Sequence, residues 1–123
     1  MIDFENGAVF KLRRVKEEAV LDNIVPLLTR DEKIIGSYKT VRDTVVFTTK
    51  RVIAVNVQGI GKRKDYTSLP YSKVTAFSVE TSGVIDIDSE LQMYFSGLGR
   101  VSFEFTGGSD IVLIGRMISE HIL

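Results

Sequence analysis

Three consecutive basic residues follow a glycine pair in the middle of the chain. They are Lys62, Arg63 and Lys64, directly after Gly59-Ile60-Gly61. Backbone N–H groups in a glycine turn and three cations together suit a phosphate, so the segment is a candidate site for an anion or an acidic lipid head group. A solvated hairpin whose charges protect an exposed strand predicts the same residues. That second interpretation is favoured, because three cations at about 1 kcal/mol each do not anchor a neutral protein stably.

Three carboxylates alternate along a second segment, at Asp86, Asp88 and Glu90. On a strand they would share one face, where they could suit a divalent cation or a basic surface on another subunit. The spacing of a calcium-binding EF-hand loop is absent, since Leu91 stands where that loop needs glycine and Gly97 where it needs glutamate. We expect an ordinary polar outer face, with contact to a neighbouring subunit as its functional interpretation.

Catalytic motifs are missing from the sequence. The chain has no cysteine and a single histidine, His121, close to its end, with no nucleophile elbow or phosphate-binding loop elsewhere. We therefore expect no enzymatic activity, no metal site and no cofactor.

Composition limits the partners. Sixteen basic and sixteen acidic residues give a formal net charge of zero, so no overall field draws the chain to nucleic acid or to an anionic membrane. The start of the chain is acidic and no apolar run approaches the roughly 18 residues of a membrane span. These features predict a cytoplasmic protein that binds no nucleic acid and associates with membranes peripherally at most. The length suits one domain, residues 1–123.

The N-terminal region has apolar residues at helical spacing. Residues 12–28 are predicted to be helical, with Pro26 ending the helix near Ile24. The apolar residues form two stripes, which would let the helix contact its own domain and a neighbouring copy at once. The candidate oligomer contacts on this helix are Leu12, Val15, Ala19, Val20 and Ile24.

From residue 33 onward the pattern changes to alternating or β-branched runs. Seven strands are predicted, at residues 33–40, 44–49, 52–57, 62–69, 73–81, 85–95 and 100–106. Short turns between them imply antiparallel neighbours, and the alternation places Val101, Phe103 and Phe105 in the core. A terminal amphipathic helix is predicted over residues 110–122, with Ile111, Ile114 and Ile118 on its apolar stripe.

Several ordered segments resemble the bacterial pleckstrin-homology-like family. The likeness is densest in residues 49–53, 69–74, 77–81 and 86–91, which read TKRVI, LPYSKV, FSVET and DIDSEL. It implies a seven-stranded, bent antiparallel barrel closed by a C-terminal helix over residues 32–123, with residues 1–28 as a helical extension. It also implies assembly into symmetric rings, without an assigned ligand. Eukaryotic relatives bind phosphoinositides through basic residues of the first hairpin, where this chain offers Lys39 and Arg42.

Together these patterns favour a non-catalytic binding or assembly module that forms a homo-oligomeric ring, with a further protein partner as a possibility. The alternative is a membrane-surface adaptor that recognises acidic head groups through Lys39, Arg42 and the basic triplet.

Overall fold

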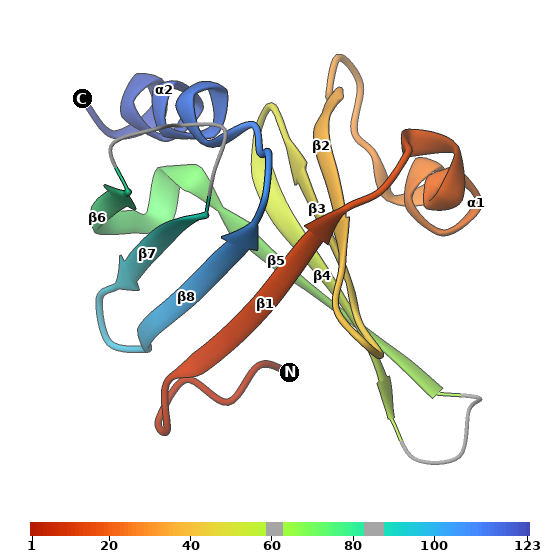
Figure 1. Cartoon of the computed structure of the whole chain (residues 1–123), viewed down its shortest axis with the longest axis horizontal. Helices are drawn as coiled ribbons and strands as arrows, with labels where there is room; N and C mark the ends of the chain where they lie inside the picture. Colours follow the sequence, from red (N-terminus) through yellow and green to blue (C-terminus); the bar gives the residue numbers. More distant parts are fainter. Residues whose placement is uncertain (59–62, 83–87) are drawn as a thin grey trace.

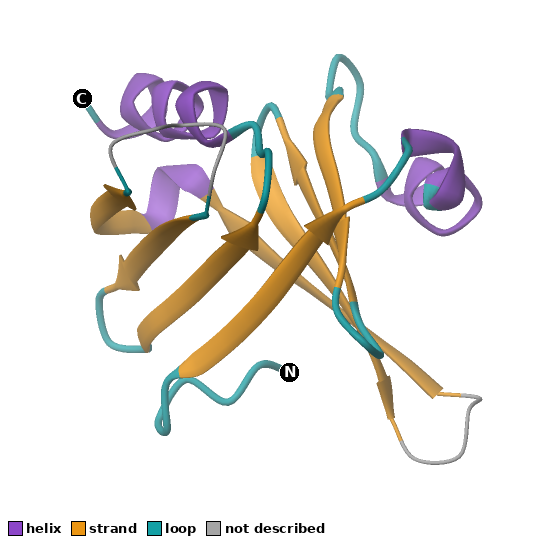
Figure 2. Ribbon diagram, viewed as in Figure 1, coloured by secondary structure: helices purple, strands orange, loops and turns teal. Residues whose placement is uncertain are grey.

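The described residues form eight strands of one strongly curled sheet, and a helix lies over one end of it (Figures 1 and 2). The structure is a computed structural model that describes residues 1–58, 63–82 and 88–123. The strands are β1 (Ala8–Arg14), β2 (Ile34–Lys39), β3 (Thr44–Thr48), β4 (Arg51–Gln58), β5 (Arg63–Pro70), β6 (Val74–Thr81), β7 (Ser89–Phe95) and β8 (Gly99–Thr106). The helices are α1 (Leu21–Ile24) and α2 (Ile111–Ile122), with short 3₁₀ turns η1 (Glu17–Ala19), η2 (Val25–Leu27) and η3 (Tyr71–Lys73).

The strand order across the sheet is β5-β4-β3-β2-β1-β8-β7-β6. Chain neighbours pair antiparallel, except that β5 and β6 occupy opposite ends of the order. The two halves are joined by β1, which pairs with β8 in parallel from Ala8↔Val101 to Arg13↔Thr106. The predicted mainly β fold with a C-terminal helix is confirmed, with eight strands in place of seven.

The additional strand replaces part of the predicted N-terminal helix. Residues 8–14 are β1, so the prediction of a helix from Leu12 is wrong. Phe10 and Leu12 are buried while Lys11 and Arg13 are exposed, which is the alternation of a strand with one face on a core. Backbone pairing with β8 outweighs the weak helical preference of so short a segment. Within residues 12–28, α-helix is confined to α1, which ends at Ile24, before Pro26, as predicted.

The main core fills the inner face of the curled sheet, beneath α2. Phe103 lies at its centre, stacked on Phe10 at 5.5 Å between ring centroids and edge-on to Phe47 at 5.3 Å. The predicted inward residues of β8 are buried, as are those of α2, whose stripe Ile111, Ile114 and Ile118 faces this core. The terminal helix therefore closes the barrel in the way the sequence indicates.

A second, smaller cluster lies on the opposite face of the same sheet. Val20 and Ile24, from the N-terminal helical segment, pack on Val46, Ile53 and Val55 of β3 and β4. Because side chains alternate along a strand, these residues face away from the main core. Figure 1 shows α1 and α2 far apart, at opposite sides of the molecule. Among the described residues, none of the helices is both long enough and apolar enough to cross a bilayer.

Candidate functional site

Basic residues from two turns meet at one end of the sheet. The Arg42 side chain donates a 3.5 Å hydrogen bond to the Val57 carbonyl, and Val57 pairs with Lys64 in the β4–β5 ladder. Arg42 and Lys64 therefore lie at the same end of the sheet. Arg63, the first residue of β5, pairs with Gln58 in the same β4–β5 ladder. The Lys64 ammonium donates to the Asn23 side chain of α1 at 3.3 Å. Lys62 lies outside the described residues.

Lys39 belongs to a different basic group, which the sequence did not reveal. It is the last residue of β2 and stands directly opposite Arg13 of β1. Lys11 lies two residues before Arg13 on the same outward face of β1. The helix predicted from Leu12 hid this group, although the alternation of Phe10 and Leu12 with Lys11 and Arg13 could have indicated it.

Acidic residues occupy the outer face of the other half of the sheet. Glu80, Glu90 and Glu104 stand opposite one another across β6, β7 and β8, and Asp88 lies nearby. A surface hollow of about 270 Å³ is lined by these four acidic residues and their neighbours. Of the predicted acidic residues, Glu90 accepts from the Gln92 amide at 2.6 Å, Asp88 accepts from the Gly107 backbone at 2.8 Å, and Asp86 lies outside the described residues.

The described carboxylates of this face are not arranged to hold a metal ion. In the part of the chain that the structure describes, no group of three or more histidine, cysteine or acidic side chains has a metal-binding arrangement. The three aligned glutamates repel one another. Like charges directly opposite on neighbouring strands destabilise a sheet. A basic surface placed over them would relieve that cost.

The predicted apolar contact residues near the N-terminus are largely internal. Leu12 is part of the main core, and Val20 and Ile24 are buried in the second cluster. Val15 is half-buried against that cluster, and only Ala19 is exposed. The interpretation of this segment as a two-sided oligomer helix is therefore wrong for Leu12, Val20 and Ile24, because their side chains are used within the chain.

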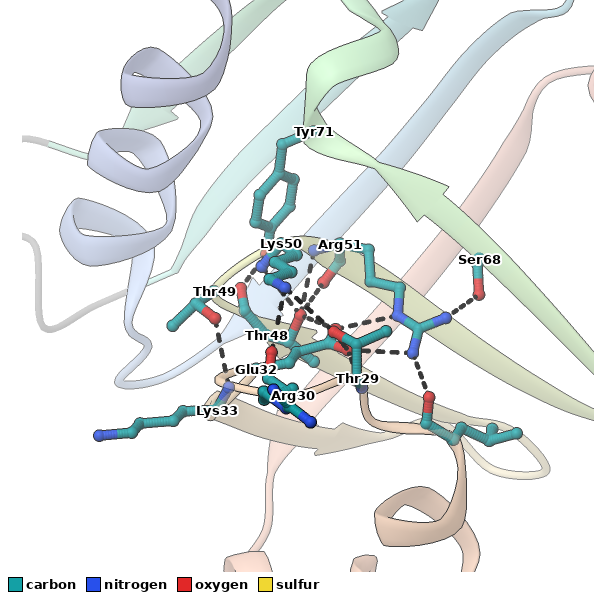
Figure 3. Close-up of polar contacts among 11 residues, drawn as sticks. Thr29, Arg30, Glu32, Lys33, Thr48, Thr49, Lys50, Arg51, Ser68 and Tyr71 are labelled. Atoms are coloured by element: carbon teal, nitrogen blue, oxygen red, sulfur yellow. Dashed lines mark hydrogen bonds and ion pairs between the residues drawn. The ribbon is translucent and has the colours of Figure 1, made fainter.

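A buried ion pair joins the loop before β2 to the β3–β4 turn (Figure 3). The Arg51 guanidinium donates to both oxygens of Glu32, at 2.9 and 3.1 Å, and its remaining donors reach the Ser68 hydroxyl and the Leu27 carbonyl. Thr48 donates to the same carboxylate at 2.6 Å. Through these bonds the cluster fastens the N-terminal segment to the sheet.

The electrostatics of this cluster favour the charged pair. Burial opposes ionisation of Glu32, but the hydrogen bonds from Arg51, the Thr29 backbone and Thr48 outweigh it and lower the pKa to about 2. Burial also raises the pKa of the Tyr71 hydroxyl, which donates to the Thr48 carbonyl at 2.7 Å. Neither group is poised to exchange a proton near neutral pH, so catalysis is not indicated here.

Comparison with known proteins identifies a family for this geometry. A family model described as "Bacterial PH domain" matches residues 3–122. The chain is 38% identical to the uncharacterized protein YjqA of Bacillus subtilis (strain 168), over 94% of this chain and 95% of that protein. A DUF1696 family protein with a pleckstrin-homology domain from Shewanella loihica PV-4 is similar in structure, with a TM-score of 0.71 and 34% identity over 93% of this chain and 99% of that one. A pleckstrin homology domain from Shewanella amazonensis SB2B has a TM-score of 0.58 and 37% identity, covering 89% and 90%.

Proposed function

Since this chain belongs to the bacterial PH domain family, we propose that it is a non-catalytic binding module that works as a closed homo-oligomer. Small barrels of this kind present surfaces on a rigid scaffold, and the chemistry of those surfaces determines what they bind. The described residues form open sheet edges and charged faces. Among them, no acid, base and nucleophile lie together as in a catalytic site.

The observation that carries this proposal is the difference between the two edge strands of the sheet. Among the described strands, β5 and β6 each have a neighbour on one side only. β5 begins with Arg63, Lys64 and Asp65 and ends at Pro70, all of which discourage the pairing of another strand. β6, with the sequence VTAFSVET, carries one charge, Glu80, and no proline. An edge without such protection is suited to a neighbouring subunit.

Charge supports a head-to-tail arrangement of copies. The outer face beside β6 carries the row formed by Glu80, Glu90 and Glu104, whereas the β5 edge begins with Arg63 and Lys64. Contact between these unlike surfaces is heterologous, and such contacts close into a ring when the rotation per subunit divides a full turn. The charges would set register more than affinity.

An aromatic side chain next to this edge can supply apolar contact. Tyr94 of β7 is 42% exposed and stands opposite Ala76 of β6 on the outer face. Tyrosine is enriched among the residues that contribute most to protein interfaces, because its ring buries a large area at little entropic cost. Because Tyr94 lies beside the open edge, a neighbouring subunit that pairs with the backbone of β6 would also bury the Tyr94 ring.

Light scattering with size-exclusion chromatography tests the assembly. At tens of micromolar the intact chain is expected to have the mass of several subunits. Ser78→Lys places a charge on the exposed middle of β6 and should give the monomer. Ser72→Lys makes the same change at an exposed position of η3 outside the strand and should leave the oligomer intact. A monomeric intact chain would overturn the proposal.

The membrane-adaptor alternative predicts a different result. It requires sedimentation of the intact chain with vesicles that contain acidic phospholipid, and loss of that sedimentation on neutralising Arg42, Arg63 and Lys64. The hydrogen bonds of Arg42 and Lys64 to groups of this chain give those two residues structural partners, which is why we place assembly first.

A further inference from the structure

A hollow separate from the acidic one lies where β1 leaves β2, close to the start of α2. Its volume is about 300 Å³. The lining residues come from the end of β1 and the residues after it, from the first half of β2, and from the residue before α2: Arg14, Val15, Glu17, Ile34, Ile35, Gly36, Ser37 and Asp110. The hollow therefore belongs to the beginning of β2 and not to the turn toward β3.

The hollow exists because β1 and β2 part early. β2 pairs with β1 only through Tyr38 and Lys39, and next to them the Val15 N–H donates to the Ser37 carbonyl at 2.9 Å. The chain then turns away into η1, so residues 34–36 have no described strand beside them on that side. The space between the diverging segments is open to solvent and to a ligand.

A buried hydroxyl in this lining lacks a partner. Ser37 is 3% exposed, and its hydroxyl makes no hydrogen bond in the part of the chain that the structure describes. Leaving a buried hydroxyl unpaired costs stability, so such groups are rare in folded proteins and each one calls for an explanation. A ligand seated in the hollow would supply the missing partner.

One wall of the hollow is a charged pair. The Asp110 carboxylate accepts from the Tyr38 hydroxyl at 2.7 Å and pairs with the Arg14 guanidinium at 3.0 Å. Gly36 permits this arrangement, because a Cβ atom there would lie 2.7 Å from the Asp110 carboxylate, too close for a side chain. The guanidinium has five N–H donors and reaches Asp110 through one nitrogen, so Arg14 keeps donors for a ligand.

The opposite charge comes from Glu17. It is the first residue of η1, is exposed, and its side chain forms no ion pair or hydrogen bond with the described residues. Once Arg14 is paired with Asp110, the lining therefore offers a ligand one cationic and one anionic group. The remaining surface is apolar and consists of three half-buried aliphatic side chains, Val15, Ile34 and Ile35.

We propose that this hollow binds a small zwitterion, an α-amino acid with an aliphatic side chain. The ligand's carboxylate suits the free donors of Arg14, and its ammonium group suits Glu17. The Ser37 hydroxyl can donate to the carboxylate or accept from the ammonium group, and in either case gains a partner. The aliphatic part would cover Val15 and Ile34. A volume of about 300 Å³ is at the lower end for ligand pockets, which suits a molecule of this size.

The site is separate from the proposed assembly. It uses neither the β6 edge nor the row formed by Glu80, Glu90 and Glu104. A monomeric chain could bind the ligand, and an oligomer could fail to bind it. Light scattering and ligand titration therefore test the two proposals independently.

Saturation-transfer-difference nuclear magnetic resonance tests the site, because it detects a weakly bound ligand whatever the size of the protein assembly. L-Leucine added to the intact chain is expected to give a saturable signal. N-acetyl-L-leucine lacks the ammonium charge, L-leucinamide lacks the carboxylate and glycine lacks the side chain, so each should bind about tenfold more weakly. No saturable signal with L-leucine, or equal binding of L-leucine and its N-acetyl and amide forms, would overturn the proposal.

Matched variants locate the binding. Ser37→Ala should weaken leucine binding about fivefold, as loss of one neutral hydrogen bond requires, whereas Ser102→Ala removes a buried hydroxyl of β8 outside the hollow and should have no effect. Glu17→Gln should weaken binding about tenfold, whereas Glu18→Gln changes the next residue of the same turn, outside the hollow, and should not. Circular dichroism of each variant checks that it is folded. Equal effects within either pair would overturn the proposal.

Discussion

The two faces of the sheet are covered by helical segments of different kinds. α2 is a helix of 12 residues that buries one stripe, Ile111, Ile114 and Ile118, in the main core. The N-terminal segment consists of α1, four residues long, between two 3₁₀ turns, and it buries only Val20 and Ile24 in the second cluster. An isolated helix as short as α1 is unstable in water, so its shape depends on contacts with the sheet.

The difference shows two ways to attach a helical segment. α2 is held by its own apolar stripe, whereas the N-terminal segment is held by a few apolar contacts together with a polar fastening. The Arg51 guanidinium binds both Glu32 and the Leu27 carbonyl, and Leu27 ends η2. Replacing a buried isoleucine by alanine should therefore cost different amounts of stability on the two faces. Changes to the polar fastening should affect only the face that carries the N-terminal segment.

The largest effect is expected at α2. Ile114→Ala should lower the free energy of unfolding by about 4 kcal/mol, because a fully buried side chain is removed from a rigid aromatic core that cannot collapse around the cavity. Urea denaturation measures this value. A loss below about 0.5 kcal/mol, typical of surface positions, would contradict the position of α2.

The polar fastening should come next. Glu32→Gln is expected to cost about 3 kcal/mol at neutral pH, since it leaves Arg51 largely buried without its carboxylate. The pKa of Glu32 is lowered from 4.5 to about 2, so folding favours the ionised form. The stabilisation is therefore complete above about pH 4.5 and is lost as the pH falls toward 2. Urea denaturation between pH 2 and pH 7 should show this loss in the unaltered chain and a smaller one in the variant.

The matched substitution on the second face should be milder. Ile24→Ala is expected to cost about 2 kcal/mol, because the short turns around α1 can settle into the space that the side chain leaves. Hydrogen exchange should report the change in residues 17–28 and leave α2 protected. Equal costs for Ile24→Ala and Ile114→Ala would mean that the two attachments are equally rigid.

The smallest effect is expected at Ser37 of β2. Its hydroxyl is buried and has no hydrogen-bond partner among the described residues. Ser37→Ala should leave stability unchanged or raise it by about 1 kcal/mol, because an unpaired buried hydroxyl is removed. Thr48→Val removes a buried hydroxyl that donates to Glu32, and should be destabilising. Destabilisation by Ser37→Ala as large as that by Thr48→Val would show that Ser37 has a partner.

The sequence predicted one attachment well and the other poorly, for a physical reason. Ile111, Ile114 and Ile118 repeat at the period of a helix over two turns, and Val101, Phe103 and Phe105 alternate with Ser102 and Glu104 along β8. Both patterns are long enough to exclude the other secondary structure. Leu12, Val15 and Ala19 also have helical spacing, but the pattern begins inside a strand, and its strand-like part is short.

The candidate sites, too, could be predicted from the sequence only where their residues lie close together along the chain. Contiguous residues such as Arg63 and Lys64, or an alternating pair such as Asp88 and Glu90, can be found by reading along the chain. The row formed by Glu80, Glu90 and Glu104 depends on the register of three strands. The meeting of Arg13 with Lys39 depends on the antiparallel pairing of β1 with β2, which local spacing does not indicate. Such groups can be predicted only after the pairing of the strands is known.

The parallel pairing of β1 with β8 also bears on biosynthesis. Ala8 pairs with Val101, a partner made 93 positions later (101 − 8), so β1 leaves the ribosome long before β8 exists. Contacts this distant in sequence slow folding, since the intervening chain must first be brought together. Until then Phe10 and Leu12, which end in the core, lack their pairing partners Phe103 and Phe105 of β8. A ribosome stalled before β8 would therefore display an apolar segment suited to chaperone binding, and the native sheet would form only after β8 has left the ribosome.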